Sequence, residues 1–222
     1  MAKDFNQPQI VEHYDQHIRK LIPGYELVHQ QVQALLQLHL KGKNAHILVV
    51  GCGTGQELIQ LASHFTNWQF TAIDCAIHMI QKVEQRIEKS KLSNKINLIC
   101  ADTSMLSMHL REFDAALSIL VAHFVEDKFA FYQDIYESLK PNGLCVSYDL
   151  MQLQQGDDLR LKYLAEITGL HPKQSQLMCE RLEKDFQLVS VGHMQKLYSD
   201  VGFKSSEIFC QIFNYHGVLA LK

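Results

Sequence analysis

Three glycines spaced two residues apart, followed later by an aspartate, form the pattern in this chain that most clearly indicates a ligand-binding site. The segment Gly51-Cys52-Gly53-Thr54-Gly55 directly follows an apolar run, and the next apolar run ends on Asp74. Alternate glycines let a backbone turn tightly and pass close to a ligand, because side chains there would block the turn or the approach. An aspartate after the next strand can accept hydrogen bonds from both hydroxyls of a ribose. The pattern therefore predicts a site for an adenosine compound.

The residue after the glycine segment indicates which adenosine compound is favoured. The dinucleotide fingerprint G-x-G-x-x-G requires a glycine or alanine at position 56, and this chain has Gln56. We therefore rank an NAD-dependent oxidoreductase below an enzyme whose adenosine cofactor has no pyrophosphate.

His123 is the candidate catalytic residue. It follows an apolar run that ends at Leu120, so its ring could face a cleft and deprotonate a substrate near neutral pH. The alternative is a histidine that only hydrogen-bonds a loop. Asp74 and Asp102 have similar alternatives, because aspartates at these places also serve as a helix cap and as a turn residue.

A second polar group lies near the N-terminus, where His13 and His17 stand four residues apart on one helical face. Neither a third ligand nor an H-E-x-x-H pattern accompanies them, so we predict no metal site. We expect this segment to form a cap that closes over the substrate. The residues predicted to line the substrate site are Tyr14, His17, Tyr148 and Arg181.

Strand-like and helical patterns alternate along the middle of the chain, which favours an α/β fold with a mainly parallel sheet. Strands rich in Ile, Val, Leu and Phe are predicted at Ile47–Val50, Gln69–Ile73, Ile96–Cys100, Ala115–Leu120 and Leu144–Tyr148. Helices are predicted at Gln56–His64, Ile77–Lys89 and Lys128–Leu139, the last of which ends before a turn at Pro141-Asn142-Gly143. Ligands of such sheets lie at the carboxyl ends of the strands, where Asp74, Asp102 and His123 would gather.

The segments around this core are predicted to be helical caps and a closing strand pair. Pro8–Gly42 has the pattern of two helices broken at Pro23-Gly24, and Leu153–Val201 is largely helical. Ser206–Phe213 and Val218–Leu221 would form two strands around a turn. We therefore predict one domain over residues 1–222, with a cap (1–43), a cofactor-binding core (44–150), a second helical cap (151–201) and a strand pair (202–222).

Composition fits one large core without identifying a function. The chain has 222 residues, of which 47% are apolar. It contains no apolar stretch near the roughly 18 residues that span a bilayer, and no apolar signal core near its start, so we expect a cytoplasmic protein. A net charge of −3 with interleaved charges argues against a general nucleic-acid or membrane surface. The six cysteines form no C-x-x-C pair, and we expect reduced, mostly buried thiols.

Further motifs accompany the glycine segment and Asp74. They are Ala101-Asp102 after the third predicted strand, Leu139-Lys140-Pro141-Asn142-Gly143 before the fifth, and Gly202-Phe203 before the closing strands. Together these residues resemble the class I S-adenosylmethionine-dependent methyltransferases. The resemblance implies a Rossmann-like, seven-stranded, mostly parallel sheet with helices on both faces and an antiparallel last strand.

The same resemblance implies the cofactor S-adenosyl-L-methionine, the product S-adenosyl-L-homocysteine and methyl transfer to an acceptor, for which we expect a small molecule. The cofactor-binding residues that it implies are Tyr25, Gly51, Cys52, Gly53, Thr54, Gly55, Asp74, Cys75, Ala76, Met79, Ala101, Asp102, Thr103, Ile119 and Leu120. One position departs from the pattern. Many relatives carry an acid that helps to hold the methionine amino group where this chain has Val49.

The two ends of the chain resemble a subgroup that includes carboxy-S-adenosylmethionine synthase. The likeness rests on Ile22-Pro23-Gly24-Tyr25 and on the closing residues 210–222. It implies that Tyr25 contacts the cofactor from a helical cap and that an arginine clamps an added carboxylate, for which Arg181 is the candidate. We rank methyl transfer first. A synthase-like enzyme, an oxidoreductase and a noncatalytic cofactor-binding protein are the alternatives, and a homodimer is left open.

Overall fold

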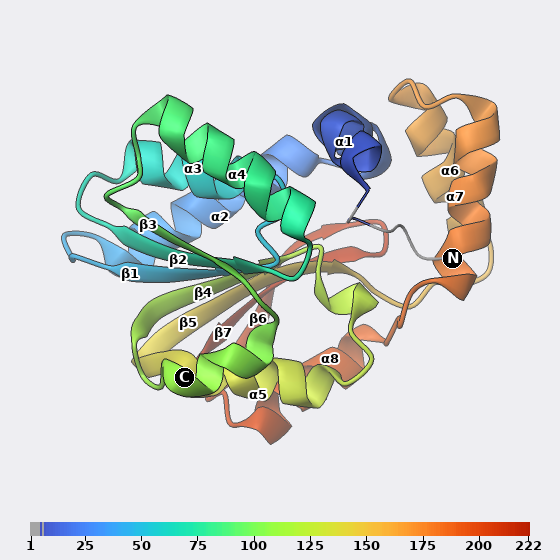
Figure 1. The fold of residues 1–222 in the computed structure, drawn as a ribbon. Helices are drawn as coiled ribbons and strands as arrows, with labels where there is room; N and C mark the ends of the chain where they lie inside the picture. The colour runs from blue at the N-terminus through green and yellow to red at the C-terminus, as the bar shows by residue number, and fades with distance from the viewer. Residues whose placement is uncertain (1–4, 6) are drawn as a thin grey trace.

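A seven-stranded sheet, in the order β3-β2-β1-β4-β5-β7-β6, runs through the computed structural model, which describes residue 5 and residues 7–222 (Figure 1). Its strands are β1 (His46–Val50), β2 (Gln69–Asp74), β3 (Ile96–Cys100), β4 (Phe113–Ile119), β5 (Leu139–Leu150), β6 (Ser205–Ile212) and β7 (Tyr215–Leu221). Strands β1 to β5 pair in parallel, whereas β7 runs antiparallel to both of its neighbours. The predicted sheet architecture is confirmed.

Helices cover both faces of this sheet (Figure 1). The helices α2 (Tyr25–Leu40), α3 (Gln56–His64) and α4 (Ile77–Ser90) lie over one face, and α5 (Lys128–Ser138) and α8 (Val191–Val201) lie over the other. The short 3-10 turns η1 (Thr103–Met108) and η2 (Ala122–Phe124) follow β3 and β4. Because both faces are covered, neighbouring residues of β1 are buried in opposite cores, with Ile47 in one and Leu48 in the other.

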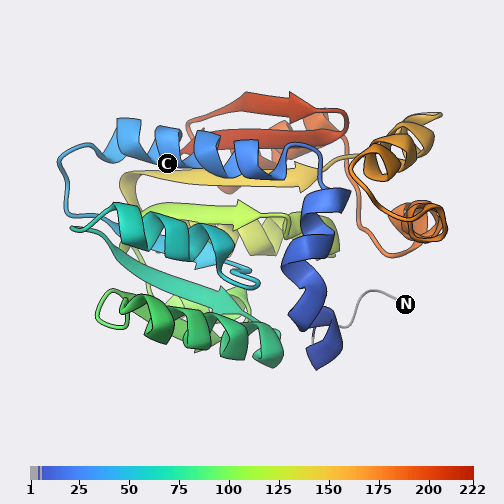
Figure 2. The same cartoon turned by 90° about the horizontal axis from the view of Figure 1, so that it is seen from above.

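Three helices stand beyond the edge of the sheet where the parallel strands end. Figure 2 shows α1 (Pro8–Leu21) across this edge, with α6 (Asp157–Ile167) and α7 (Pro172–Lys184) beside it. The hydroxyl of Thr168, just after α6, donates to the Lys20 carbonyl of α1 at 2.6 Å. Two helical segments that are distant in sequence therefore form one cap over the strand ends, as predicted.

Helix breaks in the N-terminal cap lie where the sequence placed them. Pro8 occupies the first turn of α1, where its missing N–H is not needed. The break between α1 and α2 falls on Pro23 and Gly24, and Gly24 has a φ of 65°, which a glycine adopts without steric cost.

Two predicted turns are wrong in their boundaries. Strand β5 begins at Leu139 instead of Leu144, because the register with β4 shifts and residues 140–143 bulge, with Asn142 at a φ of 63°. Strand β7 begins at Tyr215, so Gly217 lies inside it instead of in a turn. A Cβ at Gly217 would lie 2.4 Å from Cζ of Phe209, so this glycine makes room for an aromatic ring.

The prediction of mostly buried thiols is also wrong in part. Cys52 and Cys145 are buried, but Cys75 and Cys100 are exposed at the strand ends.

Within residue 5 and residues 7–222, no helix combines the length and apolar character needed to cross a membrane.

Candidate functional site

The glycine loop after β1 is held against the end of β2. Asp74 accepts hydrogen bonds from the Gly53 amide at 2.8 Å and from the Ala76 amide at 2.9 Å, one on each carboxylate oxygen. Gly51 has a φ of 65°, and a Cβ there would lie 2.4 Å from Cγ2 of Val121. A Cβ on Gly53 would meet no atom of the described residues within 4 Å, so the backbone faces open space in this part of the structure. This arrangement leaves room for a ligand to lie directly on the loop.

A cleft of about 670 Å³ opens between this loop and the ends of the next strands. The predicted cofactor-binding residues on its wall are Gly51, Gly53, Asp74, Cys75, Met79, Ala101, Asp102, Thr103, Ile119 and Leu120. The predicted residues Tyr25, Cys52 and Thr54 line a smaller niche that shares Gly51 and Gly53 with the cleft. Most of the predicted cofactor-binding residues therefore line two adjoining spaces.

Gly55 and Ala76 line neither space and support the site from behind. Gly55 caps the start of α3 at a φ of 77° and packs against Val83, and the Ala76 amide binds Asp74. Their place is structural, which corrects the prediction that both contact the cofactor.

The two acids at the cleft differ in their surroundings. Burial raises the pKa of the Asp74 carboxyl, and the hydrogen bonds from the Ala76 and Gly53 amides partly oppose this. Asp102 caps η1 and accepts from the amide and hydroxyl of Ser104, at 2.9 Å and 2.5 Å, and these bonds lower its pKa. The alternative that Asp102 is a turn residue with local hydrogen bonds is thus observed, and the residue still lies on the cleft wall.

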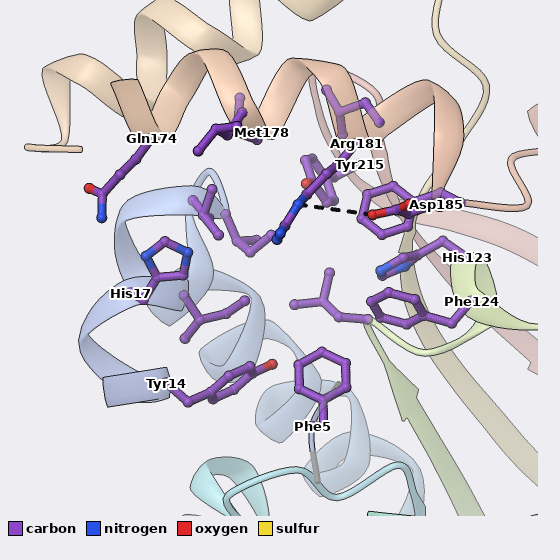
Figure 3. A pocket seen from close by; sticks show the side chains of 17 residues that line it. Phe5, Tyr14, His17, His123, Phe124, Gln174, Met178, Arg181, Asp185 and Tyr215 are labelled. Atoms are coloured by element: carbon purple, nitrogen blue, oxygen red, sulfur yellow. Dashed lines mark ion pairs between the residues drawn. The ribbon is translucent and has the colours of Figure 1, made fainter. Parts of the chain in front are cut away.

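A second cavity, of about 270 Å³, adjoins the cleft beneath the helical cap (Figure 3). The two spaces share five wall residues, which are Phe5, Tyr14, Leu120, Phe124 and Asp185. The cavity wall is mostly apolar, with side chains from α1, η2, α7 and the loop after α7. Its polar side chains are Tyr14, His17, His123, Gln174, Arg181, Asp185 and Tyr215. A molecule in this cavity would lie next to a ligand in the cleft.

Leu120 stands at the junction of the two spaces in a strained conformation. Its φ is 62°, a region that residues with a Cβ rarely adopt, and its amide donates to the Tyr148 carbonyl at 2.7 Å. Such strain persists where the surrounding structure enforces it, and it concentrates at functional sites.

His123 lies in the wall of the second cavity, paired with a buried carboxylate. Its Nδ1 atom is 2.8 Å from Oδ1 of Asp149, and both side chains are buried. Because a carboxylate only accepts hydrogen bonds, Nδ1 is the donor, and in the neutral form of the ring Nε2 carries the lone pair. The ring is further fixed by edge contact with Phe186, at 4.8 Å between ring centres. This is the geometry of a positioned base.

Three of the four predicted substrate residues line the second cavity, and Tyr148 does not. Figure 3 shows Tyr14 and His17 on one side and Arg181 on the other, with the Arg181 guanidinium 4.0 Å from the Asp185 carboxylate. Tyr148 is fully buried in the core, and its hydroxyl donates to the Pro23 carbonyl at 3.3 Å. Its assignment to the substrate site is therefore wrong.

Two acids of the site were missed from the sequence. Asp149 interrupts an apolar run near the end of β5, and a buried acid in such a run is a signal that it has a partner. Glu57 comes two residues after the glycine segment, in the first turn of α3, where acids commonly only face the helix dipole. Across the described residues, no group of three or more His, Cys, Asp or Glu is arranged to hold a metal ion.

The cap is fastened to the glycine loop by one polar cluster. Asp15 of α1 accepts from the Thr54 hydroxyl at 2.5 Å and pairs with Arg86 of α4, and Arg86 also donates to the Thr54 carbonyl at 2.8 Å. Thr54 thus joins the loop to α1 and does not cap α3. Tyr14 is the residue before Asp15, so the cluster also positions Tyr14, which lines both the cleft and the second cavity.

Replacing Asp15 with alanine is expected to weaken the binding of S-adenosylhomocysteine about fivefold. The loss is modest because these groups are partly exposed, so water screens the pair and replaces part of it. Isothermal titration calorimetry measures the change, with Glu12→Ala on the exposed face of α1 as the matched control. Equal affinities of the Asp15 variant and wild type would show that the cluster does not hold the cap in its binding position.

Comparisons with known proteins agree with this site. Residues 47–143 match a family profile described as a methyltransferase domain. Sterol 24-C-methyltransferase of Pneumocystis carinii is 30% identical over 151 residues, which are 66% of this chain and 39% of that protein. Carboxy-S-adenosyl-L-methionine synthase of Vibrio atlanticus is 21% identical over 228 residues and is matched nearly end to end, with 96% of this chain and 91% of that protein covered.

Solved structures share the fold over the whole chain. A putative S-adenosylmethionine-dependent methyltransferase of Methanococcus maripaludis superposes with a TM-score of 0.72 at 17% identity, covering 100% of this chain and 95% of that one. A methyltransferase of Aquifex aeolicus gives 0.65 at 16% identity, covering 97% and 98%.

The glycine loop, the strand-end acid and the order of the strands define a Rossmann-like α/β protein that binds an adenosine cofactor at the carboxyl edge of its sheet. Within that class, the methyltransferase domain matched over residues 47–143 and the methyltransferase relatives support a class I S-adenosylmethionine-dependent methyltransferase, with S-adenosylmethionine as the cofactor.

Proposed function

We propose that this enzyme methylates a small, largely apolar molecule whose attacking atom gives up a proton to His123. The observation that carries the proposal is the His123–Asp149 pair in the wall of a cavity that adjoins the cofactor cleft. The cavity volume of about 270 Å³ lies near the lower end of the range for small-molecule sites. Its apolar wall favours an acceptor with a hydrophobic body.

S-adenosylmethionine, when bound, supplies a methyl group that is already electrophilic on its positively charged sulfur. The residues of the chain then have two tasks. Leu120, Tyr14 and the cap helices align the acceptor and exclude water, and such positioning can contribute on the order of 7 to 11 kcal/mol. The Nε2 atom of His123 takes the proton of an acceptor O–H or N–H, and Asp149 stabilises the resulting imidazolium.

The proposal is tested by methyl transfer from isotopically labelled S-adenosylmethionine to a panel of small phenols, carboxylic acids and amines. Mass spectrometry should find the label in at least one class of acceptor, and Asp74→Ala protein should give none at the same cofactor concentration. Native mass spectrometry of the purified protein identifies any retained cofactor beforehand. Label found on protein or RNA, and on no small molecule, would contradict the proposal.

A synthase-like reaction is the second candidate, and one observation favours it. Arg181 borders the cavity next to the cofactor cleft, where a guanidinium could bind a carboxylate with two hydrogen bonds (Figure 3). The carboxy-S-adenosylmethionine synthases also match this chain over nearly their whole length. This candidate therefore predicts that the bound cofactor carries a carboxylate.

Replacing Arg181 with leucine separates the two candidates. If the enzyme is synthase-like, wild-type protein retains a carboxylated cofactor in native mass spectrometry, and the variant loses it while its affinity for S-adenosylhomocysteine stays within about twofold. The matched control is Arg160→Leu, which removes an exposed arginine of α6. Wild-type protein that retains only S-adenosylmethionine or S-adenosylhomocysteine would exclude the synthase-like function.

A further inference from the structure

Glu57 has a buried carboxylate at the inner end of the cofactor cleft. It lies in the first turn of α3, is 8% exposed, and lines a niche of about 20 Å³. The niche shares Tyr14, Gly51 and Gly53 with the cleft, so it continues the space in which the cofactor lies. A volume of this size accommodates about one water-sized group.

No cationic side chain in the described part of the chain pairs with Glu57. The nearby Arg86 is bound to Asp15 and to the Thr54 carbonyl. The backbone hydrogen bond that Glu57 accepts within its own residue favours the ionised carboxyl but supplies no charge. Buried carboxylates are normally also paired with a cation. The described residues therefore supply no positive charge that would balance the Glu57 carboxylate in the niche.

His29 lines the same niche and is also incompletely satisfied. It is 4% exposed, and among the described residues neither of its ring nitrogens has a hydrogen-bond partner. Burial lowers the pKa of His29 to about 4, so the ring is neutral and offers one donor and one acceptor. Buried polar atoms of this kind are rare in folded proteins and point to a missing partner.

We propose that Glu57, with His29 on the same niche, binds the α-ammonium group of the cofactor's methionine part. An ammonium fits the niche in size, supplies the missing positive charge and has three donors for the polar atoms around it. The acid that many relatives carry earlier in the chain is replaced here by the buried Val49, so Glu57 takes over its task from the other side of the loop. The inference rests on S-adenosylmethionine being the cofactor and is independent of the acceptor.

The same contact links cofactor binding to pH. Burial, together with the charges of Asp74 and Asp15, raises the pKa of Glu57 to about 7. An ammonium group favours the ionised carboxylate, so binding at or below neutral pH releases a proton to the solvent. The groups that face Glu57 are Tyr14 and Asp15 from α1, Tyr25 and His29 from α2, Cys52 from the glycine loop and Asp74 from β2.

These neighbours leave Glu57 as the group that titrates near neutrality. Burial raises the pKa values of Tyr14, Tyr25 and Cys52, so all three stay protonated, and the lowered pKa of His29 keeps its ring neutral. Asp15 is paired with Arg86. Asp74 faces the ribose part of the site, so its contact is the same for every ligand that contains adenosine.

The test compares two ligands that differ in the amino-acid end, S-adenosylhomocysteine and 5′-methylthioadenosine. Both are uncharged at sulfur, and only the first carries an ammonium and a carboxylate. Glu57→Gln should weaken S-adenosylhomocysteine binding about 10- to 100-fold, the range for a lost charged hydrogen bond. The affinity for 5′-methylthioadenosine should stay within about twofold, and the control Glu84→Gln on the exposed face of α4 should change neither.

Two further measurements distinguish binding from a structural role at the start of α3. For wild-type protein, calorimetry of S-adenosylhomocysteine in two buffers at pH 6.5 should show proton release, and 5′-methylthioadenosine should show less. Because a carboxyl whose pKa is raised on folding costs stability as pH rises from about 4.5 to 7, ligand-free Glu57→Gln should melt above wild type at pH 8. That difference should shrink toward pH 5. A helix-capping role predicts a variant that melts lower at pH 8.

The outcomes separate this inference from the cofactor assignment. Wild-type protein that bound neither ligand would contradict the placement of the adenosine site itself. Equal losses for both ligands, or an unchanged affinity for S-adenosylhomocysteine in Glu57→Gln, would overturn the role of Glu57 alone. If the variant does not fold, an absence of extra proton release by wild-type protein would overturn it as well.

Discussion

Replacing His123 with alanine is expected to lower kcat for the methylated acceptor by about 10²- to 10⁴-fold, the usual contribution of a positioned general base. The affinity for S-adenosylhomocysteine should stay within about twofold, because His123 lines the acceptor cavity and not the cofactor cleft. The separation of the two effects is the signature of a group that acts on the acceptor. The measurement is steady-state kinetics with the acceptor found by label transfer.

Asp149→Asn provides the second arm of this experiment. The amide nearly preserves the shape of the carboxylate but can donate to Nδ1, so the ring would carry its hydrogen on Nε2 and could no longer accept a proton there. We expect a loss of the same order as in His123→Ala, and little further loss when the two changes are combined, because the residues act as one unit.

The pH dependence gives a readout that a structural role would not move. A general base must lose its proton before it can act, so kcat/KM of wild-type enzyme should rise with pH on the acid side, and this rise should flatten in His123→Ala. The control His64→Ala changes an exposed histidine at the far end of α3. A His123 variant with wild-type kcat at every pH would show that the ring only supports the loop.

Most residues that local patterns assigned to the cofactor lie together around the cleft and its niche. The glycine loop and Asp74 belong to one strand-helix-strand unit, and the parallel pairing of β1 with β2 brings them together. Parallel strands also end at one edge, so Asp102 could be placed beside Asp74 without knowledge of the packing. The same holds for the N-terminal cap segment, whose helix break falls at Pro23 and Gly24.

The acceptor side depends on register and packing, which local patterns do not contain. Tyr148 and Asp149 are neighbours on β5, and neighbouring strand residues point to opposite faces of a sheet. The prediction chose Tyr148, which faces one core, whereas Asp149 on the other face meets His123. Only the pairing of β4 with β5 brings these positions together, after a register shift at residues 140–143 that the sequence presented as an ordinary turn.

Glu57 and His29 were missed for a different reason. Each has an ordinary explanation in its own helix. Glu57 is a first-turn acid facing the helix dipole, and His29 is one of the residues on the buried face of α2. Their lack of partners becomes visible once α2 packs beside the glycine loop and encloses both side chains.

Replacing Asp74 with alanine is expected to have the largest effect on cofactor binding. The carboxylate lies on the cleft wall, and each oxygen keeps a lone pair beyond the bond it accepts from the loop. Two charge-assisted hydrogen bonds to the ribose hydroxyls contribute about 1.5 to 3 kcal/mol each, so their loss weakens binding by about 10²- to 10⁴-fold. Calorimetry with S-adenosylhomocysteine measures this, with Asp200→Ala on the exposed side of α8 as the control.

A ligand without the ribose hydroxyls separates direct contact from support of the loop. Asp74 also holds the Gly53 and Ala76 amides, so its removal could weaken binding by loosening the glycine segment alone. If the contact is direct, 2′,3′-dideoxy-5′-methylthioadenosine binds wild-type protein weakly and loses little more in Asp74→Ala, because its missing hydroxyls and the missing carboxylate remove the same bonds. If the carboxylate only shapes the loop, the variant weakens the dideoxy ligand as much as the parent ligand, and our placement of the ribose is wrong.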